Sequence, residues 1–285
     1  MARPINPSVP KRQLGLALAG LREAAGKSRE DAAGVVECSE SKISRIERGH
    51  VGVRASELRD LLNFYGVTGQ QRTELEELAR GTRRRRPRTT YGKALPDWFR
   101  RYVNLEEAAS EIRTYDGELV TGILQTENYA RAITRASPLH RPEDVDRLVQ
   151  ARIARQARLT SDNPPQMWVV MAEGVLRTRV GGREIMRAQL DHILEVGHLP
   201  NVTIQVTPFS SGAHASSGIN FSLLRFPDEV GVDVVYLEDL TSASYLDKPD
   251  DPQRQQYVLV FNHLTAGALS PTESLELVDT VKQEL

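Results

Sequence analysis

The stretch Leu21–Val67, LREAAGKSREDAAGVVECSESKISRIERGHVGVRASELRDLLNFYGV, decides the fold of the N-terminal part of this chain. Its spacing predicts a short helix from Ser28, a tight turn over residues 35–38 and a second short helix from Ser39. The second helix has a polar face of Glu40, Ser41, Lys42 and Arg45, and an apolar face of Ile43 and Ile46. A helix with this pattern fits the major groove of DNA, which is wide enough to admit it.

Apolar residues at helical spacing extend the pattern to a compact bundle of about five short helices over residues 14–80. Residues 1–13 contain prolines and are predicted to be a flexible arm. Residues 81–95 are predicted to be a basic linker, because the like charges of Arg83–Arg86 repel each other and Pro87 ends a helix.

The formal net charge of −1 hides an asymmetry along the chain. Residues 1–93 hold 19 Lys and Arg against 11 Asp and Glu, whereas residues 94–285 hold 18 against 27. A basic N-terminal third followed by an acidic remainder indicates a DNA-binding head on a body that does not bind DNA. The alternative is that the opposite charges only promote contact between the two parts.

The single cysteine, Cys38, excludes an intrachain disulfide and a cysteine-based zinc site. We expect it to be a small buried apolar residue, with a redox switch as the alternative. No apolar run approaches the ~18 residues needed to span a bilayer, and no N-terminal segment resembles a signal peptide. We therefore expect a cytoplasmic protein without a membrane partner.

Residues 96–285 show a different pattern, which predicts a helical block over 96–160 and a mixed α/β block over 165–285. In the first block we expect one helical stretch from Pro96 to about Arg135 and an amphipathic helix over 143–160. In the second block, strands are predicted at 167–171, 202–206, 221–226 and 232–237, and helices at 184–196, 252–266 and from Pro271. The predicted fold class is therefore α+β, a five-helix N-terminal bundle followed by a mixed α/β C-terminal domain.

The motif SxSxISRIERG at Ser39–Gly49, with the helices around it, resembles the Cro/phage-repressor type of helix-turn-helix, the XRE family. The resemblance implies that the first residues of the third helix face base edges and that the second helix begins with a DNA contact. It assigns DNA binding to Arg29, Glu40, Ser41, Lys42 and Arg45. It also implies a structural ion pair between Arg22 and Glu47. Family members commonly carry Gln where this chain has Arg29, which puts the usual adenine contact in doubt.

The chemistry of these side chains agrees with a role in reading DNA. The Arg45 guanidinium can donate to both O6 and N7 of guanine, a contact that discriminates by ~1–3 kcal/mol. Glu40 either accepts from cytosine N4 or only stabilises the start of the helix. The run Arg83, Arg84, Arg85 and Arg86 either follows the phosphate backbone or is a solvated linker, and DNA contact is the favoured interpretation.

Segments of the body also resemble a known family. They are YDGELVTGILQTENYAR at 115–131, LPNVTIQVTPFSSGAH at 199–214, and the pair VVYLED and SYLD. They resemble the C-terminal domain of WhiJ-like regulators, which are actinobacterial proteins with an XRE head. The resemblance covers essentially the whole chain. It implies a regulator of development or antibiotic production that works with a small partner protein encoded by a neighbouring gene.

The body contains no recognisable catalytic motif, since GxSxG, HExxH and a phosphate-binding glycine loop are all absent. We therefore expect a protein that is not an enzyme and that needs no cofactor or metal. His214 is the best candidate for ligand binding because its loop joins two predicted strands, and Glu173, Glu238 and Asp239 are further candidates. The alternative is ordinary solvation of a loop residue and of strand ends.

Three functions remain, in this order. The first is a transcriptional regulator that binds double-stranded DNA as a homodimer and whose body binds a small effector or a partner protein. The second is an antitoxin-like or adaptor protein that regulates its own gene and pairs with the product of a neighbouring gene. The third is an enzyme fused to a DNA-binding head.

Overall fold

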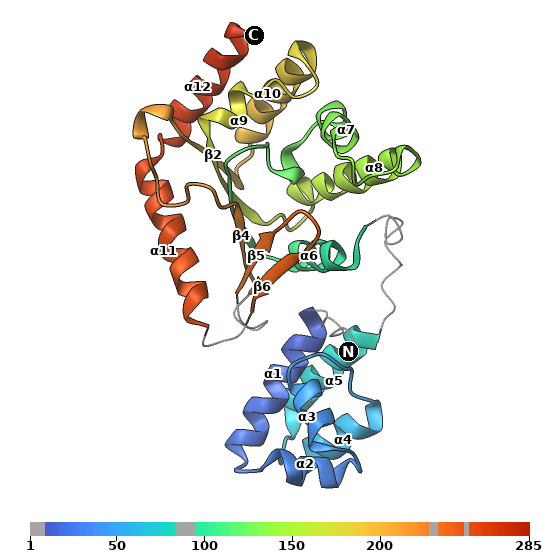
Figure 1. Cartoon of the computed structure of the whole chain (residues 1–285). Helices are drawn as coiled ribbons and strands as arrows, with labels where there is room; N and C mark the ends of the chain where they lie inside the picture. The colour runs from blue at the N-terminus through green and yellow to red at the C-terminus, as the bar shows by residue number, and fades with distance from the viewer. Residues whose placement is uncertain (1–8, 84–94, 228–232, 248–250) are drawn as a thin grey trace. The chain divides into compact units, whose positions relative to one another are not determined.

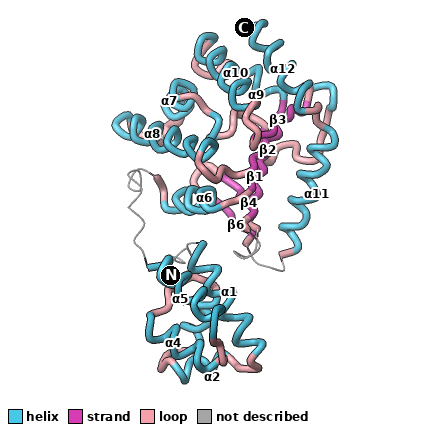
Figure 2. Tube along the Cα trace, turned by 180° about the vertical axis from the view of Figure 1, so that it is seen from behind, coloured by secondary structure: helices cyan, strands magenta, loops and turns pink. Residues whose placement is uncertain are grey.

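A computed structural model describes residues 9–83, 95–227, 233–247 and 251–285 of the chain. They divide into an N-terminal unit of helices and a C-terminal unit built on a sheet, which are described separately (Figure 1). Figure 2 shows that strands occur only in the second of these units. The predicted α+β fold, a helical N-terminal unit followed in the sequence by a unit with a mixed sheet, is confirmed.

The N-terminal unit consists of helices α1 (Val9–Ala24), α2 (Arg29–Val35), α3 (Glu40–Glu47), α4 (Ala55–Phe64) and α5 (Gly69–Arg83). Apolar residues at the predicted spacing form its core, among them Leu14, Leu18, Ile43 and Leu61. Cys38 packs against this core and is partly buried. Helix α1 begins inside the segment predicted to be a flexible arm. This is possible because Pro10 lies in the first turn, where a helix does not use the backbone N–H.

The turns between these helices have local causes in the sequence. Gly26, Gly49 and Gly66 follow helix ends with φ of +66°, +70° and +72°, in the left-handed region that favours glycine. A capping box opens α2, because Ser28 Oγ accepts from Asp31 N at 3.0 Å and the Asp31 carboxylate accepts from Ser28 N at 2.8 Å. These signals explain why the boundaries of α2 and α3 follow the sequence pattern closely.

The C-terminal unit is built on a six-stranded sheet with the order β3-β2-β1-β4-β5-β6. Strands β1, β2 and β3 are parallel, and β4, β5 and β6 each run antiparallel to the strand before them in this order. Their bounds are β1 (Glu111–Asp116), β2 (Gln166–Ala172), β3 (Val202–Thr207), β4 (Phe221–Arg225), β5 (Val234–Glu238) and β6 (Ala243–Leu246). Strands β1, β2, β3 and β5 share one direction, so they end at one edge of the sheet, here called the carboxyl edge.

Helices cover both faces of this sheet (Figure 1). One face carries α6 (Asp97–Ala108), α7 (Glu127–Ala136), α8 (Val145–Gln156), α10 (Arg183–Gly197) and α12 (Pro271–Glu284), and the other face carries α11 (Pro252–Gly267). The short helix α9 (Glu173–Arg177) follows β2 directly. Four 3₁₀ turns complete the described elements: η1 (Gly122–Leu124), η2 (Pro142–Asp144), η3 (Ala157–Thr160) and η4 (Phe209–Ser211).

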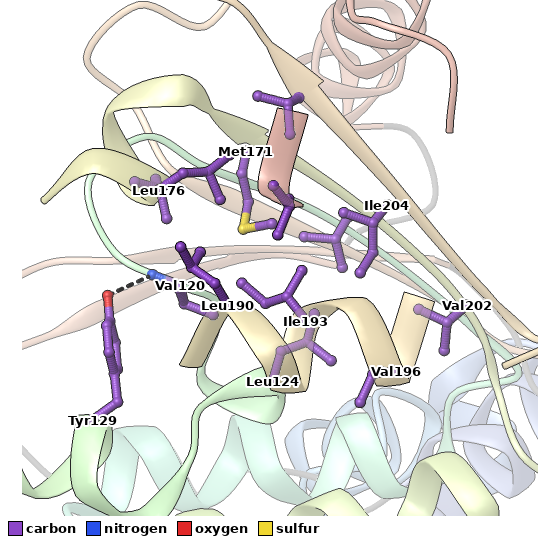
Figure 3. Close-up of a cluster of buried hydrophobic side chains, with 14 of the residues drawn as sticks. Val120, Leu124, Tyr129, Met171, Leu176, Leu190, Ile193, Val196, Val202 and Ile204 are labelled. Carbon is purple, nitrogen blue, oxygen red and sulfur yellow. Dashed lines mark hydrogen bonds between the residues drawn. The ribbon is translucent and has the colours of Figure 1, made fainter. Parts of the chain in front are cut away.

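Strand β2 lies between two apolar cores. Val169 and Met171 point into the larger core, part of which is shown in Figure 3, and Val170 points into the smaller core beneath α11. A strand that is buried on both faces needs apolar residues at every position. This is the reason why the run over 167–171 reads as a continuous apolar segment.

The predicted helical block over 96–160 is wrong in its middle part, because strand β1 follows α6 at the centre of the sheet. The strand has no apolar run because polar residues alternate with its buried ones. Arg113 and Glu111 form an ion pair of 2.5 Å, and the Arg113 guanidinium faces the rings of Trp168 and Phe261. The edge strand β6, with only four residues, is also absent from the prediction. The four predicted strands correspond to β2, β3, β4 and β5.

Candidate functional site

Helix α3 presents a polar face on the surface of the N-terminal unit. Ser39 Oγ starts the helix by accepting a hydrogen bond from Lys42 N at 3.3 Å. On the inner face, Ile43 and Ile46 are only 1% and 3% exposed. On the outer face, Glu40, Ser41 and Arg45 are exposed. This outer face is the candidate nucleic-acid interface.

Arg45 is a cationic residue of this outer face whose side chain is accessible to a ligand such as DNA. Its side chain is exposed and forms no ion pair with any residue of the described ranges. The backbone that carries it is fixed, because Arg45 O accepts from His50 N at 2.8 Å and from Val51 N at 3.3 Å. A guanidinium on a rigid helix end is suited to the two-donor contact with guanine.

Lys42, a predicted DNA contact, is bound within the protein. Its Nζ lies 2.6 Å from Oε1 of the buried Glu57, at the start of α4. Burial alone raises the pKa of the Glu57 carboxyl, but hydrogen bonds from Lys42 and from Arg54 N outweigh burial, and the pKa is lowered. Lys42 therefore connects α3 to α4, and its contact with DNA stays a prediction.

Glu47, the last residue of α3, connects three helices. Its Oε1 lies 2.5 Å from Arg22 Nε of α1, and its Oε2 lies 2.8 Å from Arg29 Nε of α2. The hydrogen bond to Glu47 raises the pKa of the Arg22 guanidinium in spite of its burial. The predicted Arg22–Glu47 pair is confirmed. Arg29, a predicted DNA contact, is bound to the same carboxylate, although its side chain remains 40% exposed.

The arginine run Arg83–Arg86 falls almost wholly outside the described residues. Arg83 is the last residue of α5, and residues 84–94 are not described. The side chains of Arg84, Arg85 and Arg86 therefore have no assigned place, and their contact with phosphate stays a prediction.

Two of the predicted ligand-site residues, His214 and Glu173, are engaged separately in the C-terminal unit. His214 Nε2 lies 3.1 Å from Tyr115 Oη, and the two rings meet edge to face with centroids 5.3 Å apart. Glu173 is buried, and its carboxylate accepts from Arg177 Nε at 2.6 Å and from Phe209 N at 2.8 Å. Glu173 thus holds the loop after β3 to α9, and each of its two oxygens accepts a hydrogen bond within the protein.

Glu238 is the last residue of β5, at the carboxyl edge, and Asp239 follows it. Glu238 is exposed and accepts from Tyr236 Oη at 2.7 Å, and its charge influences Asp116 at the end of β1. Asp239 shapes the turn to β6 by accepting from Leu240 N at 2.7 Å. No hydrogen bond within the described ranges joins His214, Glu173 and Glu238, and a ligand site formed by them stays a prediction.

A group of polar residues around Asp116 is absent from the sequence prediction. Arg152 and Arg155 of α8 both lie over Gly122, since a methyl group there would be 3.9 Å from Arg152 Nε and 3.6 Å from Arg155 Nη1. Arg155 forms a two-point ion pair with the buried Glu106, at 2.7 and 2.5 Å. Two arginines on the inner side of an amphipathic helix are the sequence signal that could have indicated this group.

Asp116 itself is a half-buried carboxyl group. It accepts from Thr114 Oγ1 at 3.0 Å and from the Thr121 hydroxyl, and forms no ion pair with a described residue. The pKa of Asp116 is raised to about 7, mainly by burial and further by the negative charge of Glu238.

Because of Asp116, we expect the free energy of unfolding to decrease as pH rises from about 4 to about 7. In this window the folded chain keeps a proton on Asp116 that the unfolded chain has already released, so rising pH favours unfolding. The variant Asp116→Asn should therefore be more stable than the wild type by about 1–3 kcal/mol near pH ~8, with little gain near pH ~4. Urea denaturation at both pH values measures the difference, with the exposed Asp162→Asn as control. The same pH dependence in Asp116→Asn and wild type would contradict this assignment.

Comparison with protein families finds two matches. Residues 99–280 match a family described as a domain of unknown function (DUF5753). Residues 13–75 match a family described as a helix-turn-helix domain. The first match falls in the C-terminal unit and the second in the N-terminal unit. The comparison with curated proteins found no match. Within the described ranges, no helix combines the length and the apolar composition needed to cross a membrane.

Proposed function

This chain belongs to the DUF5753 family, and we propose that it is a sequence-specific transcriptional regulator whose DUF5753 domain controls a DNA-binding head. The observation that carries the proposal is the outer face of α3, where Arg45 is exposed while Ile43 and Ile46 anchor the helix in the core. The helix-turn-helix match supports DNA binding by the same unit. The basic balance of residues 1–93 suits the phosphate backbone of DNA.

The contacts within the head suggest a division of roles among the predicted DNA contacts. We assign base reading to Glu40, Ser41 and Arg45, whose side chains are exposed. Arg29 is assigned to phosphate, because only its Nε is used by Glu47 and a guanidinium has further donors on its other nitrogens. Glu47 would then hold the phosphate contact and the reading helix in one fixed arrangement.

We further propose that the head is of the Cro/phage-repressor type and acts as a homodimer. The motif SxSxISRIERG at Ser39–Gly49 supports this type. Two copies on a palindromic operator would place their α3 helices about 34 Å apart, one turn of the DNA helix.

The DUF5753 domain is proposed to be WhiJ-like and to respond to a small effector or to a partner protein from a neighbouring gene. The segments at 115–131 and 199–214 support this, as does the acidic balance of residues 94–285, which disfavours DNA contact by this domain. Such a regulator would serve actinobacterial development or secondary metabolism.

Replacing Arg45 with alanine tests the role of α3. Binding to the preferred DNA sequence should weaken by about 1–3 kcal/mol, because a two-donor contact with guanine is lost. Binding to random DNA should change much less, since it depends on the phosphates. The preferred sequence is first selected from a random DNA pool with the wild-type protein, and affinities are then measured by fluorescence anisotropy at one salt concentration.

Arg59→Ala is the matched control. Arg59 is exposed on α4, where its Nε lies 3.5 Å from Asp60, and its loss removes the same charge from the same unit. This variant should keep the sequence preference of the wild type. Equal losses on preferred and random DNA in Arg45→Ala would contradict base reading by α3. Selection of no preferred sequence would contradict the proposed function as a whole.

A further inference from the structure

We propose that the DUF5753 domain binds a small zwitterionic molecule, with the anionic group of the ligand on Arg152 and its ammonium group at Asp116 and Glu238. The inference deepens the proposed function, because such a ligand would be the effector that controls the DNA-binding head. All residues of the proposed site belong to the C-terminal unit.

Arg152 provides the anion-binding half of this site. Its side chain is half-buried, and its hydrogen-bond partner within the described ranges is neutral, since Nη1 donates to Gln125 Oε1 at 2.6 Å. No carboxylate of the described ranges lies within ion-pair distance of it. Burial, together with the nearby charge of Arg155, lowers the pKa of Arg152 to about 10. A carboxylate or phosphate from outside the protein would compensate this charge.

Arg155 shows what a fully compensated arginine looks like on the same helix. It forms a two-point ion pair with Glu106, and its guanidinium lies 5.3 and 5.4 Å from the ring centroids of Phe99 and Tyr102. The fold thus provides a carboxylate and two aromatic rings for one arginine and a single amide for its neighbour Arg152. Buried cations without a counter-charge are candidates for ligand binding.

Asp116 and Glu238 provide the cation-binding half. They stand at the ends of β1 and β5, at the carboxyl edge, where sheets of α/β domains commonly bind ligands. Hydroxyl groups hold both carboxylates, those of Thr114 and Thr121 for Asp116 and that of Tyr236 for Glu238. Neither carboxylate forms an ion pair with a described residue, so an ammonium group would be their first cationic partner within these ranges.

The two halves belong to one neighbourhood. Thr121, whose hydroxyl binds Asp116, directly precedes Gly122, and a methyl group on Gly122 would lie 3.9 Å from Arg152 Nε. Glu238 ends β5, which only β4 separates from β1 in the sheet. The Tyr129 hydroxyl lies within the influence of both Asp116 and Arg152. That hydroxyl is fixed, because it accepts from Val120 N at 3.2 Å (Figure 3). Arg152 and the acids do not reach each other directly, although their charges attract. A molecule with a carboxylate and an ammonium joined by a short carbon chain would connect them.

The test is isothermal titration of the full chain, without DNA, with ω-amino acids from glycine to 6-aminohexanoate. Butanoate and butylammonium serve as probes that carry one charge each. We expect one chain length to bind saturably and to raise the melting temperature, as a ligand of the folded state must. Each single-charge probe should bind at least about tenfold more weakly, because one half of the site stays empty.

Variants then assign the two halves. Arg152→Gln, and separately Glu238→Gln, should weaken binding of the preferred amino acid by about tenfold or more. Arg147→Gln removes an exposed arginine of the same helix, paired with Asp144, and should bind like the wild type. The melting temperature without ligand shows whether each variant is folded, and Arg152→Lys, which keeps the charge, should retain part of the affinity.

Three results would overturn the proposal: no amino acid binds at millimolar concentration, Arg152→Gln binds like the wild type, or butanoate binds as tightly as the preferred amino acid. The last of these would indicate a site for anions only. None of these results depends on DNA. A failure of the ligand site is therefore distinguished from a failure of the proposed DNA-binding function, which the selection experiment with Arg45→Ala measures independently.

Discussion

Replacing Glu47 with alanine should lower the free energy of unfolding of the N-terminal unit by about 3–5 kcal/mol. Glu47 and Arg22 are 5% and 6% exposed, so the variant leaves the Arg22 cation buried without its counter-charge. Arg29 loses the same anchor, and α3 loses its link to both preceding helices. Native hydrogen exchange of the full chain measures the effect in peptides from α1 and α3, with peptides from β2 as internal reference.

Glu23→Ala is the matched control, because Glu23 also pairs with Arg22, at 3.0 Å, but its side chain is 68% exposed. An exposed pair of this kind contributes less than about 1 kcal/mol. A double variant, Arg22→Met with Glu47→Leu, removes both charges together and should recover much of the loss. If Glu47→Ala and Glu23→Ala cost the same, the buried charge pair does not stabilise the head as described.

Replacing Gly15 with alanine is the second change with a large expected effect. A methyl group on Gly15 would lie 2.4 Å from the carbonyl oxygens of both Ile46 and Glu47, in the last turn of α3. Backbone atoms cannot rotate away as a side chain can, so α1 and α3 must separate. We expect a loss of about 1–3 kcal/mol or more, together with weaker binding to the preferred DNA sequence, because the reading helix is displaced.

The same helix contains its own control. Gly20 has open space where its methyl group would lie, and an alanine in the interior of a helix is more favourable than a glycine. Gly20→Ala should therefore gain about 0.5–1 kcal/mol, so that the two identical substitutions in α1 change stability in opposite directions. Hydrogen exchange of α1 peptides measures both. A loss of similar size in both variants would contradict the close packing of α1 on α3.

The N-terminal unit could be predicted well from sequence because its signals are local. Caps, glycines and apolar spacing place each helix, and the core residues follow from the same spacing. The partners of the charged residues could not be predicted in the same way. Arg29 binds Glu47 and Lys42 binds Glu57, and in both cases the choice of acid depends on how the helices cross. A sequence pattern that assigns a cationic side chain to DNA therefore does not show whether that side chain also forms an ion pair within the protein.

The strands of the C-terminal unit could be predicted where they show a continuous apolar run, as in β2, or β-branched residues alternating with polar ones, as in β3. Strand β1 was missed because its neighbours in the sheet, and not its own sequence, make it a central strand. The proximity of Asp116 and Arg152 is harder still to predict, because it depends on the order of the strands and on the position of α8 over the sheet. Sequence patterns contain neither of these, and the grouping of His214, Glu173 and Glu238 stays a prediction for the same reason.

The central place of β1 has a consequence for the order in which the chain folds during synthesis. Ile112 of β1 pairs with Met167 of β2 and Leu224 of β4, and Val278 and Val281 of the last helix belong to the larger core. The core of the C-terminal unit is therefore incomplete until Val281 has left the ribosome, whereas the core of the head is complete at α5. A chain that ends early would carry a folded helix-turn-helix head without the domain proposed to control it, and under the proposed function it would compete with the full protein for DNA.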